Sequence, residues 1–137
     1  MRRSERAASL TAQLLAYAGK EPVGWCAVAP RGDYDALTRS RLFKPLDDLP
    51  VWSVTCFYVA KGWRRKGVTV RLLEGAVEYA KKQGAPALEG YAVVPKSAAS
   101  PDAYIYHGTL GAFQKAGFEV VKRPSPGRAY VRRDLTA

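Results

Sequence analysis

Apolar and polar residues alternate along the chain with two periods, which separate the predicted strands from the predicted helices. Apolar runs rich in β-branched and aromatic residues predict strands over residues 14–18, 23–29, 51–59, 87–94, 118–122 and 129–133. Residues 68–83 instead carry an apolar stripe at helical spacing, formed by Leu72, Leu73, Ala76, Val77 and Ala80. Shorter helices are predicted over residues 4–13, 33–40 and 108–116, with Ser4 and Asp33 as caps of the first two.

The order of these segments predicts one α/β domain, spanning residues 1–137, with helices packed on a mixed sheet. Turn residues 19–22 join the first two strands as a β-hairpin, and residues 124–127 join the last two. The strand over residues 51–59 is apolar on both faces, which is typical of a central strand. Gly84 and Pro86 end the long helix, and the strand–helix–strand order predicts a parallel, right-handed crossover.

The composition is that of a soluble globular domain. The chain has 137 residues, of which 47% are hydrophobic and 25% charged, and this excludes wholesale disorder. No apolar run approaches the ~18 residues of a membrane span, and the basic amino terminus makes a poor signal peptide. We therefore expect a cytoplasmic protein with no membrane partner.

The cysteine and histidine content limits the chemistry further. Two cysteines exclude a disulfide scaffold, and a single histidine makes a zinc site unexpected, so no metal is predicted. Neither Cys26 nor Cys56 belongs to a Cys-x-x-Cys pair, and we expect both to be small buried thiols in a reducing compartment.

Positive charge gathers in the second half of the chain. The net charge is +10; residues 1–60 hold eight basic and six acidic residues, whereas residues 61–137 hold fourteen and six. Such an excess favours anionic partners, which include nucleic acid, membrane headgroups and phosphorylated small molecules.

The chemistry is expected where the predicted central strand passes through a basic loop into the long helix. Lys61, Arg64, Arg65 and Lys66 lie in this loop, and Gly67 lets the backbone approach an anion closely. Because the first N–H groups of a helix lack intrahelical partners and the helix dipole favours negative charge, the junction predicts a phosphate site.

Two common phosphate motifs do not fit this loop. Gly62 and Gly67 have the glycine spacing of a P-loop, and Thr69 also matches, but Val68 stands where the motif requires its lysine. The pattern G-x-G-x-x-G is absent, which argues against a dinucleotide-binding fold.

Residues 59–69 (VAKGWRRKGVT) resemble the coenzyme A signature of the GNAT N-acetyltransferases, V-x-P-x-x-[RQ]-x-x-G-x-[GA]. Val59, Arg64 and Gly67 match, whereas Lys61 replaces the common proline and Thr69 replaces glycine or alanine. The hairpin sequence EPVGW at residues 21–25 and the AGF at residues 116–118 are also similar to the family. The resemblance extends in order over about residues 14–134.

The resemblance implies a GNAT-like fold, shortened at its amino terminus, that binds acetyl-CoA between the strands over residues 51–59 and 87–94. The backbone of Phe57, Tyr58 and Val59 would pair with the pantetheine arm and polarise the thioester carbonyl. The pyrophosphate would lie against the N–H groups of Arg64, Arg65, Lys66, Gly67, Val68 and Thr69. An amine that the sequence does not identify would then attack the thioester directly.

The acid and the base of such a reaction have several candidates. Glu89 and His107 are candidate general bases, because the attacking amine must be neutral. The family often protonates the leaving thiolate with a helix tyrosine, but Phe113 stands at that position, so Tyr106, Tyr104 or a water molecule would serve instead. Cys56 is a further candidate nucleophile, although a core thiol is the favoured interpretation.

Few residues precede the hairpin, whereas the family usually has a strand and one or two helices there. A partner subunit covering the site, in a homodimer joined at the exposed hairpin edge, is one expectation. Two alternatives to the enzyme stay open: a regulatory protein that binds coenzyme A without turnover, and a nucleic-acid-binding module. Trp63 within the basic loop supports the module, but the chain has no recognised nucleic-acid signature.

Overall fold

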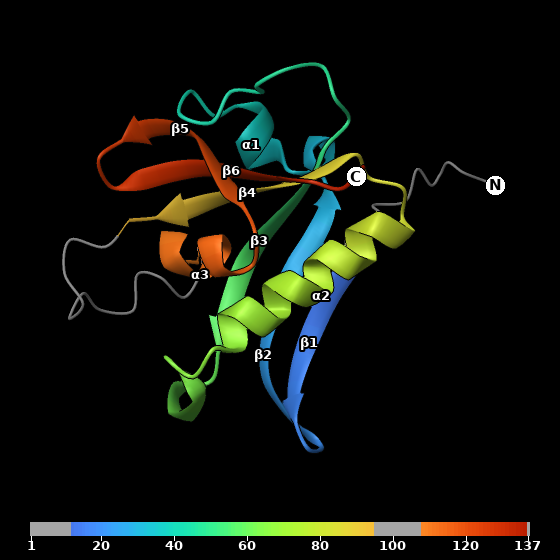
Figure 1. Ribbon diagram of the computed structural model, residues 1–137, viewed down its shortest axis with the longest axis vertical. Helices are drawn as coiled ribbons and strands as arrows, with labels where there is room; N and C mark the ends of the chain where they lie inside the picture. The colour runs from blue at the N-terminus through green and yellow to red at the C-terminus, as the bar shows by residue number, and fades with distance from the viewer. Residues whose placement is uncertain (1–11, 95–107, 137) are drawn as a thin grey trace.

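Strands in the order β1-β2-β3-β4-β6-β5 form one mixed sheet in the computed structural model, which describes residues 12–94 and 108–136 (Figure 1). The strands are β1 (Ala12–Ala18), β2 (Glu21–Pro30), β3 (Trp52–Val59), β4 (Ala87–Val93), β5 (Glu119–Ser125) and β6 (Arg128–Asp134). β3 pairs with β4 in parallel, and every other neighbouring pair is antiparallel. The predicted mixed α/β fold, with residues 51–59 at its centre, is therefore confirmed.

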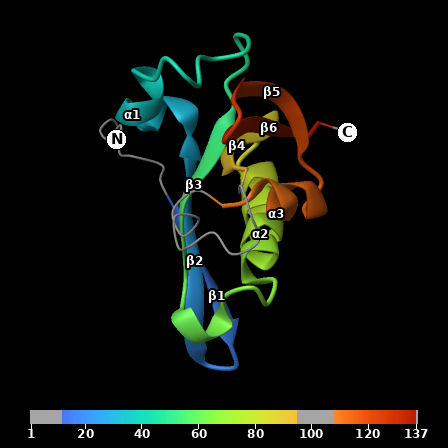
Figure 2. The same ribbon diagram turned by 90° about the vertical axis from the view of Figure 1, so that its left-hand side faces the viewer.

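Two helices cover one face of the sheet. α2 (Val68–Lys82) runs across β1, β2 and β3, and α3 (Leu110–Lys115) lies beside it (Figure 2). The apolar stripe predicted for α2 is buried against the sheet, since all five of its side chains are at most 3% exposed. α2 ends where predicted, because Gly84 takes the left-handed conformation (φ 81°) that follows many helix ends.

The opposite face is covered at one end by α1 (Asp35–Thr38) and the irregular segment 41–50 (Figure 2). Phe43 from this segment packs edge-on against Tyr91 of β4 and Tyr130 of β6, at ring-centroid distances of 5.0 and 5.6 Å. Leu37 of α1 packs against the same small cluster. This second core holds the 31–50 segment to the sheet.

Three predicted boundaries were wrong. Residues 12 and 13 begin β1, so the helix predicted over residues 4–13 does not reach them; residues 4–11 lie outside the described part. Tyr34, and not Asp33, is the residue before α1, and no side chain caps this helix. β5 continues to Ser125, which shortens the predicted final turn to Pro126 and Gly127.

Candidate functional site

The two parallel strands separate toward their carboxyl ends. β3 and β4 pair at Trp52–Leu88 and Ser53–Glu89, and the strands then diverge (Figure 1). A bulge in β3 lies in the same stretch: the register with β2 shifts between Trp25 and Ala27, and Cys56 has a φ of 59°. The backbone of β3 beyond Ser53 is therefore turned away from β4, as the resemblance implies for the pantetheine-binding strand.

The three β3 residues proposed to pair with pantetheine lie beyond this divergence. Phe57 is buried and packs edge-on against Phe113 of α3, with ring centroids 5.9 Å apart. Tyr58 is partly exposed and pairs with Trp25 of β2. The Val59 carbonyl accepts a hydrogen bond from Arg64 Nε at 3.0 Å, which ties the following loop to the end of the strand.

The loop after β3 turns its backbone toward the start of α2. A 3-10 turn (Lys61–Trp63) is followed by Arg65 (φ 63°) and Gly67 (φ 83°), both in the left-handed region. Left-handed Gly67 directly precedes the right-handed residues of α2, and such a change of hand directs successive N–H groups into a concavity that suits an anion. The first helical hydrogen bond here runs from Arg71 N–H to the Gly67 carbonyl, so the N–H groups of residues 68–70 point out of the helix end.

Charge and packing complete this junction. Arg65 and Lys66 are exposed, Arg64 and Thr69 are half-buried, and the Lys66 ammonium lies 5.4 Å from the Trp63 ring centroid. Val68 is buried and packs over Gly24 of β2, where a Cβ would come 2.9 Å from Val68 and from the Tyr58 carbonyl. Glycine at position 24 thus allows the first turn of α2 to sit close to β2 and β3.

The cofactor-binding residues predicted from the sequence thus lie along one continuous path, from Phe57 to Thr69. Their arrangement alone does not show that these residues bind coenzyme A, so that role stays a prediction. Tyr106 and His107 lie outside the described residues, so their predicted roles also stay open.

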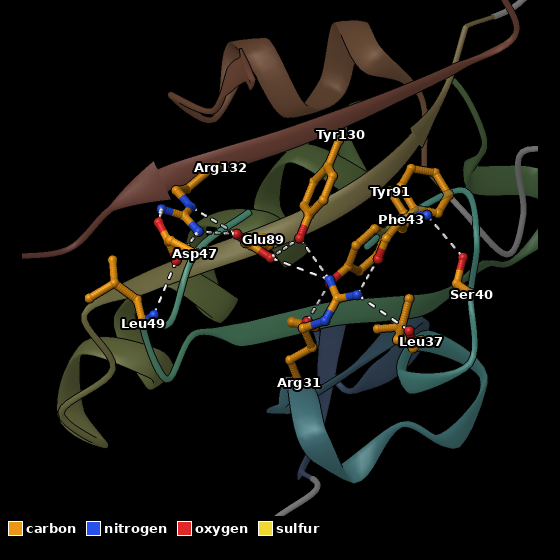
Figure 3. A network of polar contacts seen from close by, with 11 residues as sticks. Arg31, Leu37, Ser40, Phe43, Asp47, Leu49, Glu89, Tyr91, Tyr130 and Arg132 are labelled. Atoms are coloured by element: carbon orange, nitrogen blue, oxygen red, sulfur yellow. Dashed lines mark hydrogen bonds and ion pairs between the residues drawn. The ribbon is translucent and has the colours of Figure 1, made fainter. Parts of the chain in front are cut away.

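Glu89 is wholly buried (0% exposed) at the apex of the diverging strands, within a network of polar side chains (Figure 3). One carboxylate oxygen accepts a hydrogen bond from the Tyr130 hydroxyl at 2.6 Å. The other accepts from Arg132 Nε at 2.8 Å and lies 2.6 Å from Arg132 Nη2. Arg132 also holds Asp47, at 2.8 Å between Nη1 and the carboxylate, which fastens segment 41–50 to β6.

Arg31 is the second cation of this network (Figure 3). Its Nη1 lies 3.6 Å from Glu89 and donates to the hydroxyls of Tyr130, at 2.7 Å, and Tyr91, at 3.1 Å. Its Nη2 donates to the carbonyls of Leu37 and Phe43. The Tyr91 hydroxyl also lies 2.6 Å from Ser53 Oγ, so the network links β3, β4, β6 and the segment after β2 that carries α1.

The network changes the titration of its members. Burial raises the pKa of Tyr91 to about 12. Burial and the hydrogen bond donated to Glu89 both raise the pKa of Tyr130. The hydrogen bonds from Arg132 and from the Leu49 backbone N–H lower the pKa of Asp47, and those to Asp47 and Glu89 raise the pKa of Arg132.

These contacts bear on the predicted role of Glu89. Both carboxylate oxygens accept from side-chain donors, buried Tyr130 and half-buried Arg132, and neighbouring cations compensate the charge, which is the arrangement of a structural ion pair. A general base also needs an open lone pair within reach of the proton that it removes. The role of Glu89 as a general base stays a prediction. Its contacts indicate that it also stabilises the fold, which the sequence did not indicate.

Sequence reasoning missed Arg31, Asp47, Tyr91, Tyr130 and Arg132. Arg31 follows the end of a strand and carries no motif, and its hydroxyl partners lie 60 and 99 residues away. The one available signal was Glu89 itself, a carboxylate in an otherwise apolar strand that needs a buried partner.

The two cysteines differ from the expectation that both are buried. Cys26 is buried as predicted, and burial raises its pKa to about 12. Cys56 is exposed, so the predicted core thiol is wrong at this position. The physical reason is the bulge in β3, which has the left-handed backbone at Cys56.

The sequence matches the model of the Acetyltransferase (GNAT) family over residues 2–108, and the chain belongs to this family. No curated protein matches the sequence significantly. The family carries N-acyltransferase activity, in agreement with the signature and with the fold.

Solved structures share the fold at low identity. Aminoglycoside acetyltransferase AAC(6')-Ib, solved with coenzyme A and kanamycin, is 17% identical with a TM-score of 0.65; the match covers 93% of this chain and 69% of that one. The GNAT domain of S. lividans PAT is 17% identical (TM-score 0.60), with 91% and 61% of the chains covered. Ribosomal-protein-alanine N-acetyltransferase from Brucella melitensis is 17% identical (TM-score 0.56), with 90% and 68% covered. The chain thus spans about two thirds of the length of these structures.

The described residues contain neither a candidate metal-binding cluster nor a helix that could span a membrane. Residues 12–94 and 108–136 contain no group of three or more histidine, cysteine, aspartate or glutamate residues placed to hold a metal ion. Within the same ranges, every helix is too short or too polar to cross a membrane.

Proposed function

We propose that the protein transfers an acetyl group from acetyl-CoA to an amine acceptor, which attacks the thioester directly. The observation that carries this proposal is the junction of β3 and α2. There the freed backbone of β3 runs directly into a basic loop with two left-handed residues and the start of a fifteen-residue helix. Family membership and solved neighbours that hold coenzyme A support the same substrate.

The residues at this junction suit a pyrophosphate. A Cβ added to Gly67 would meet no atom within 4 Å, so the approach to the backbone at the helix start is open. The N–H groups of residues 68–70 and the side chains of Arg64, Arg65 and Lys66 would hold the pyrophosphate. Charge-assisted hydrogen bonds of this kind are about twice as strong as neutral ones.

When bound, acetyl-CoA supplies a thioester whose carbonyl carbon is open to attack by an amine. The chain would contribute backbone N–H groups of Phe57, Tyr58 or Val59 to polarise that carbonyl, which is worth a few kcal/mol, roughly 3–4 for one donor in a well-studied case. A base must keep the amine neutral, and His107 is the proposed base because the ordinary pKa of an imidazole lies near neutral pH. The acid that protonates the leaving thiolate is proposed to be Tyr106.

A second function is favoured by one observation. Phe113, at the position of the family's tyrosine, is fully buried between Phe57 and Phe118 and offers no proton. A protein that binds coenzyme A without turnover would need no acid at this position. The two functions share the binding site and differ only in catalysis.

Calorimetric titration with acetyl-CoA tests the shared site. Gly67→Glu should weaken binding at least about tenfold, because it places a negative charge where the pyrophosphate would lie. Gly84→Glu is the matched control: it adds the same charge at the other end of α2, at nearly the same φ (81° against 83°) and also in open space. Equal affinities of the two variants, or no binding by the folded wild type, would refute the site.

Turnover separates the two functions once binding is established. Release of free coenzyme A thiol is measured with acetyl-CoA and a panel of primary amines that includes aminoglycosides and peptides with a free amino terminus. Amine-dependent release above the rate of hydrolysis identifies the transferase. Tight binding without release for any amine favours the regulatory protein.

A further inference from the structure

The two edges of the sheet differ in how they are protected. β5 carries Lys122, Arg123 and Pro124, and its register with β6 shifts twice, so charge, proline and irregularity all oppose pairing with another strand. β1 (AQLLAYA) has no charged residue, and Leu15 and Tyr17 are 49% and 59% exposed. Its one irregularity lies between Ala16 and Tyr17. Within residues 12–94 and 108–136, β1 is therefore a sheet edge that lacks the usual protection.

A groove of about 630 Å³ extends along the same edge, between β1 and the first half of α2. Its floor is apolar and includes Leu14, Ala16, Ala18, Val23, Val68 and Leu72. The rim carries both signs of charge, with Lys66 and Arg71 against Glu74. Gly75 also lines the groove, and a Cβ there would meet no atom within 4 Å.

We propose that β1 pairs antiparallel with β1 of a second copy of this chain, across a two-fold axis at Leu15. A segment seated here must offer backbone hydrogen bonds to the outer edge of β1, which pairs with no other described strand, and apolar side chains on both faces. β1 itself meets both requirements, since Leu14, Ala16 and Ala18 face α2 and Leu15 and Tyr17 face the other way.

The sequence of β1 is suited to antiparallel pairing with an identical strand in this register. Pairing about Leu15 sets Leu14 opposite Ala16 and Gln13 opposite Tyr17, so a large side chain meets a smaller one in each case. In this register, the β1 residues that face α2 in one copy lie opposite the β1 residues that face α2 in the other copy. The grooves of the two copies therefore become continuous. Such self-complementarity is what an isologous interface requires.

The mixed charges on the rim of the groove support a second copy over an acidic partner. Because the rim carries both signs, two copies related by a two-fold axis can place basic groups of one near Glu74 of the other. The net charge of +10 on each copy opposes association at long range. Added salt screens that repulsion and should tighten the dimer, whereas it would weaken binding of an acidic segment. The proposal does not depend on the acetyl-transfer function.

Sedimentation equilibrium of the full chain, over a wide concentration range and at two salt concentrations, measures the association. We expect a reversible approach to twice 15.0 kDa that is favoured by salt. Leu15→Lys should raise the dissociation constant at least about tenfold. Val121→Lys on β5 is the control, because Val121 is similarly exposed (43%) on the opposite edge; it should leave the constant within about twofold.

Cross-linking tests the register independently of any loss of stability in the lysine variant. In a Cys56→Ser background, Leu15→Cys should form a disulfide-linked dimer when diamide oxidises the two thiols, and Val121→Cys should not. A monomer at every concentration would overturn the proposal. So would dimers that Leu15→Lys does not weaken, or cross-linking by Val121→Cys and not by Leu15→Cys.

Discussion

Arg132 of β6 lies directly opposite Glu89 of β4 in the antiparallel register, with Nη2 2.6 Å from the carboxylate. The pair is a cross-strand ion pair in the interior of the sheet, and Arg31 approaches the same carboxylate from the end of β2. Buried Arg31 and half-buried Arg132 thus both depend on one carboxylate at the point where β3 and β4 separate.

Glu89→Gln should therefore lower stability strongly, because it leaves Arg31, only 8% exposed, beside no negative charge. Removing one partner of a buried ion pair typically costs about 3–5 kcal/mol. Urea unfolding followed by circular dichroism measures the loss. Glu119→Gln is the control, since Glu119 is the exposed register partner of Arg132 on β5 and should change little.

The same variant also tests whether Glu89 is the general base. At a temperature where Glu89→Gln is still folded, we expect acetyl-CoA binding and any measurable turnover to persist. A folded variant of wild-type stability that has lost all turnover would contradict the structural role and favour the catalytic one.

Alkaline pH should destabilise the protein, because burial holds three of its side chains in their neutral forms. Burial raises the pKa of Cys26 from 9.0 to about 12 and that of Tyr34 and Tyr91 from 10.0 to about 12. The folded state thus favours the neutral forms, and this stability is complete below pH 9 and lost as pH rises from 9 toward 12.

The free energy of unfolding should fall by roughly 3–6 kcal/mol between pH 8 and pH 11. Tyr91→Phe should make that fall smaller, whereas Tyr17→Phe, at an exposed position, should leave it unchanged. Urea titrations at both pH values measure the difference, and a flat stability across this range would show that the buried groups titrate normally.

The two thiols should react at very different rates in the native protein. Cys56 is exposed, whereas Cys26 is buried and its pKa of about 12 leaves little thiolate at pH 8. A disulfide reagent such as DTNB should therefore modify one thiol quickly, and Cys56→Ser should abolish that phase. Denaturant should expose Cys26 in the wild type and in the Cys56→Ser variant. Equal rates for the two thiols of the native wild type would contradict the structure.

Local patterns predicted the part of the fold that carries the proposed site. The helix expected over residues 68–83 is observed as Val68–Lys82, because its stripe, its glycine and the following proline all lie within one segment. The basic loop was found the same way. The start of β1 was misassigned because the residues before it are small or polar and suit a helix as well as a strand.

The polar network could not be predicted, since it depends on contacts between distant segments. Arg132 meets Glu89 only because β6, the last strand in the chain, inserts between β4 and β5. The order of the last two strands has no local signal. The position of Arg31, directly after β2, depends on its hydrogen bond to the Phe43 carbonyl of segment 41–50. That segment was predicted only as an irregular loop.

Phe113 and Gly90 should show strong energetic coupling. Gly90 of β4 lies directly beneath the Phe113 ring, and a Cβ at position 90 would overlap that ring. Gly90→Ala should therefore destabilise the protein by about 1–3 kcal/mol through overpacking. Phe113→Leu should also destabilise it, because it leaves space beside Phe57 and Phe118.

In the double variant the added methyl group occupies part of the space that the smaller side chain leaves. The combined loss should be smaller than the sum of the single losses by about 1 kcal/mol or more. Gly111→Ala is the control, since Gly111 lies on the exposed side of α3 with no atom within 4 Å of a Cβ, and alanine favours the helix. Urea unfolding of all variants completes the cycle, and strictly additive losses would mean that Phe113 does not fill the space above Gly90.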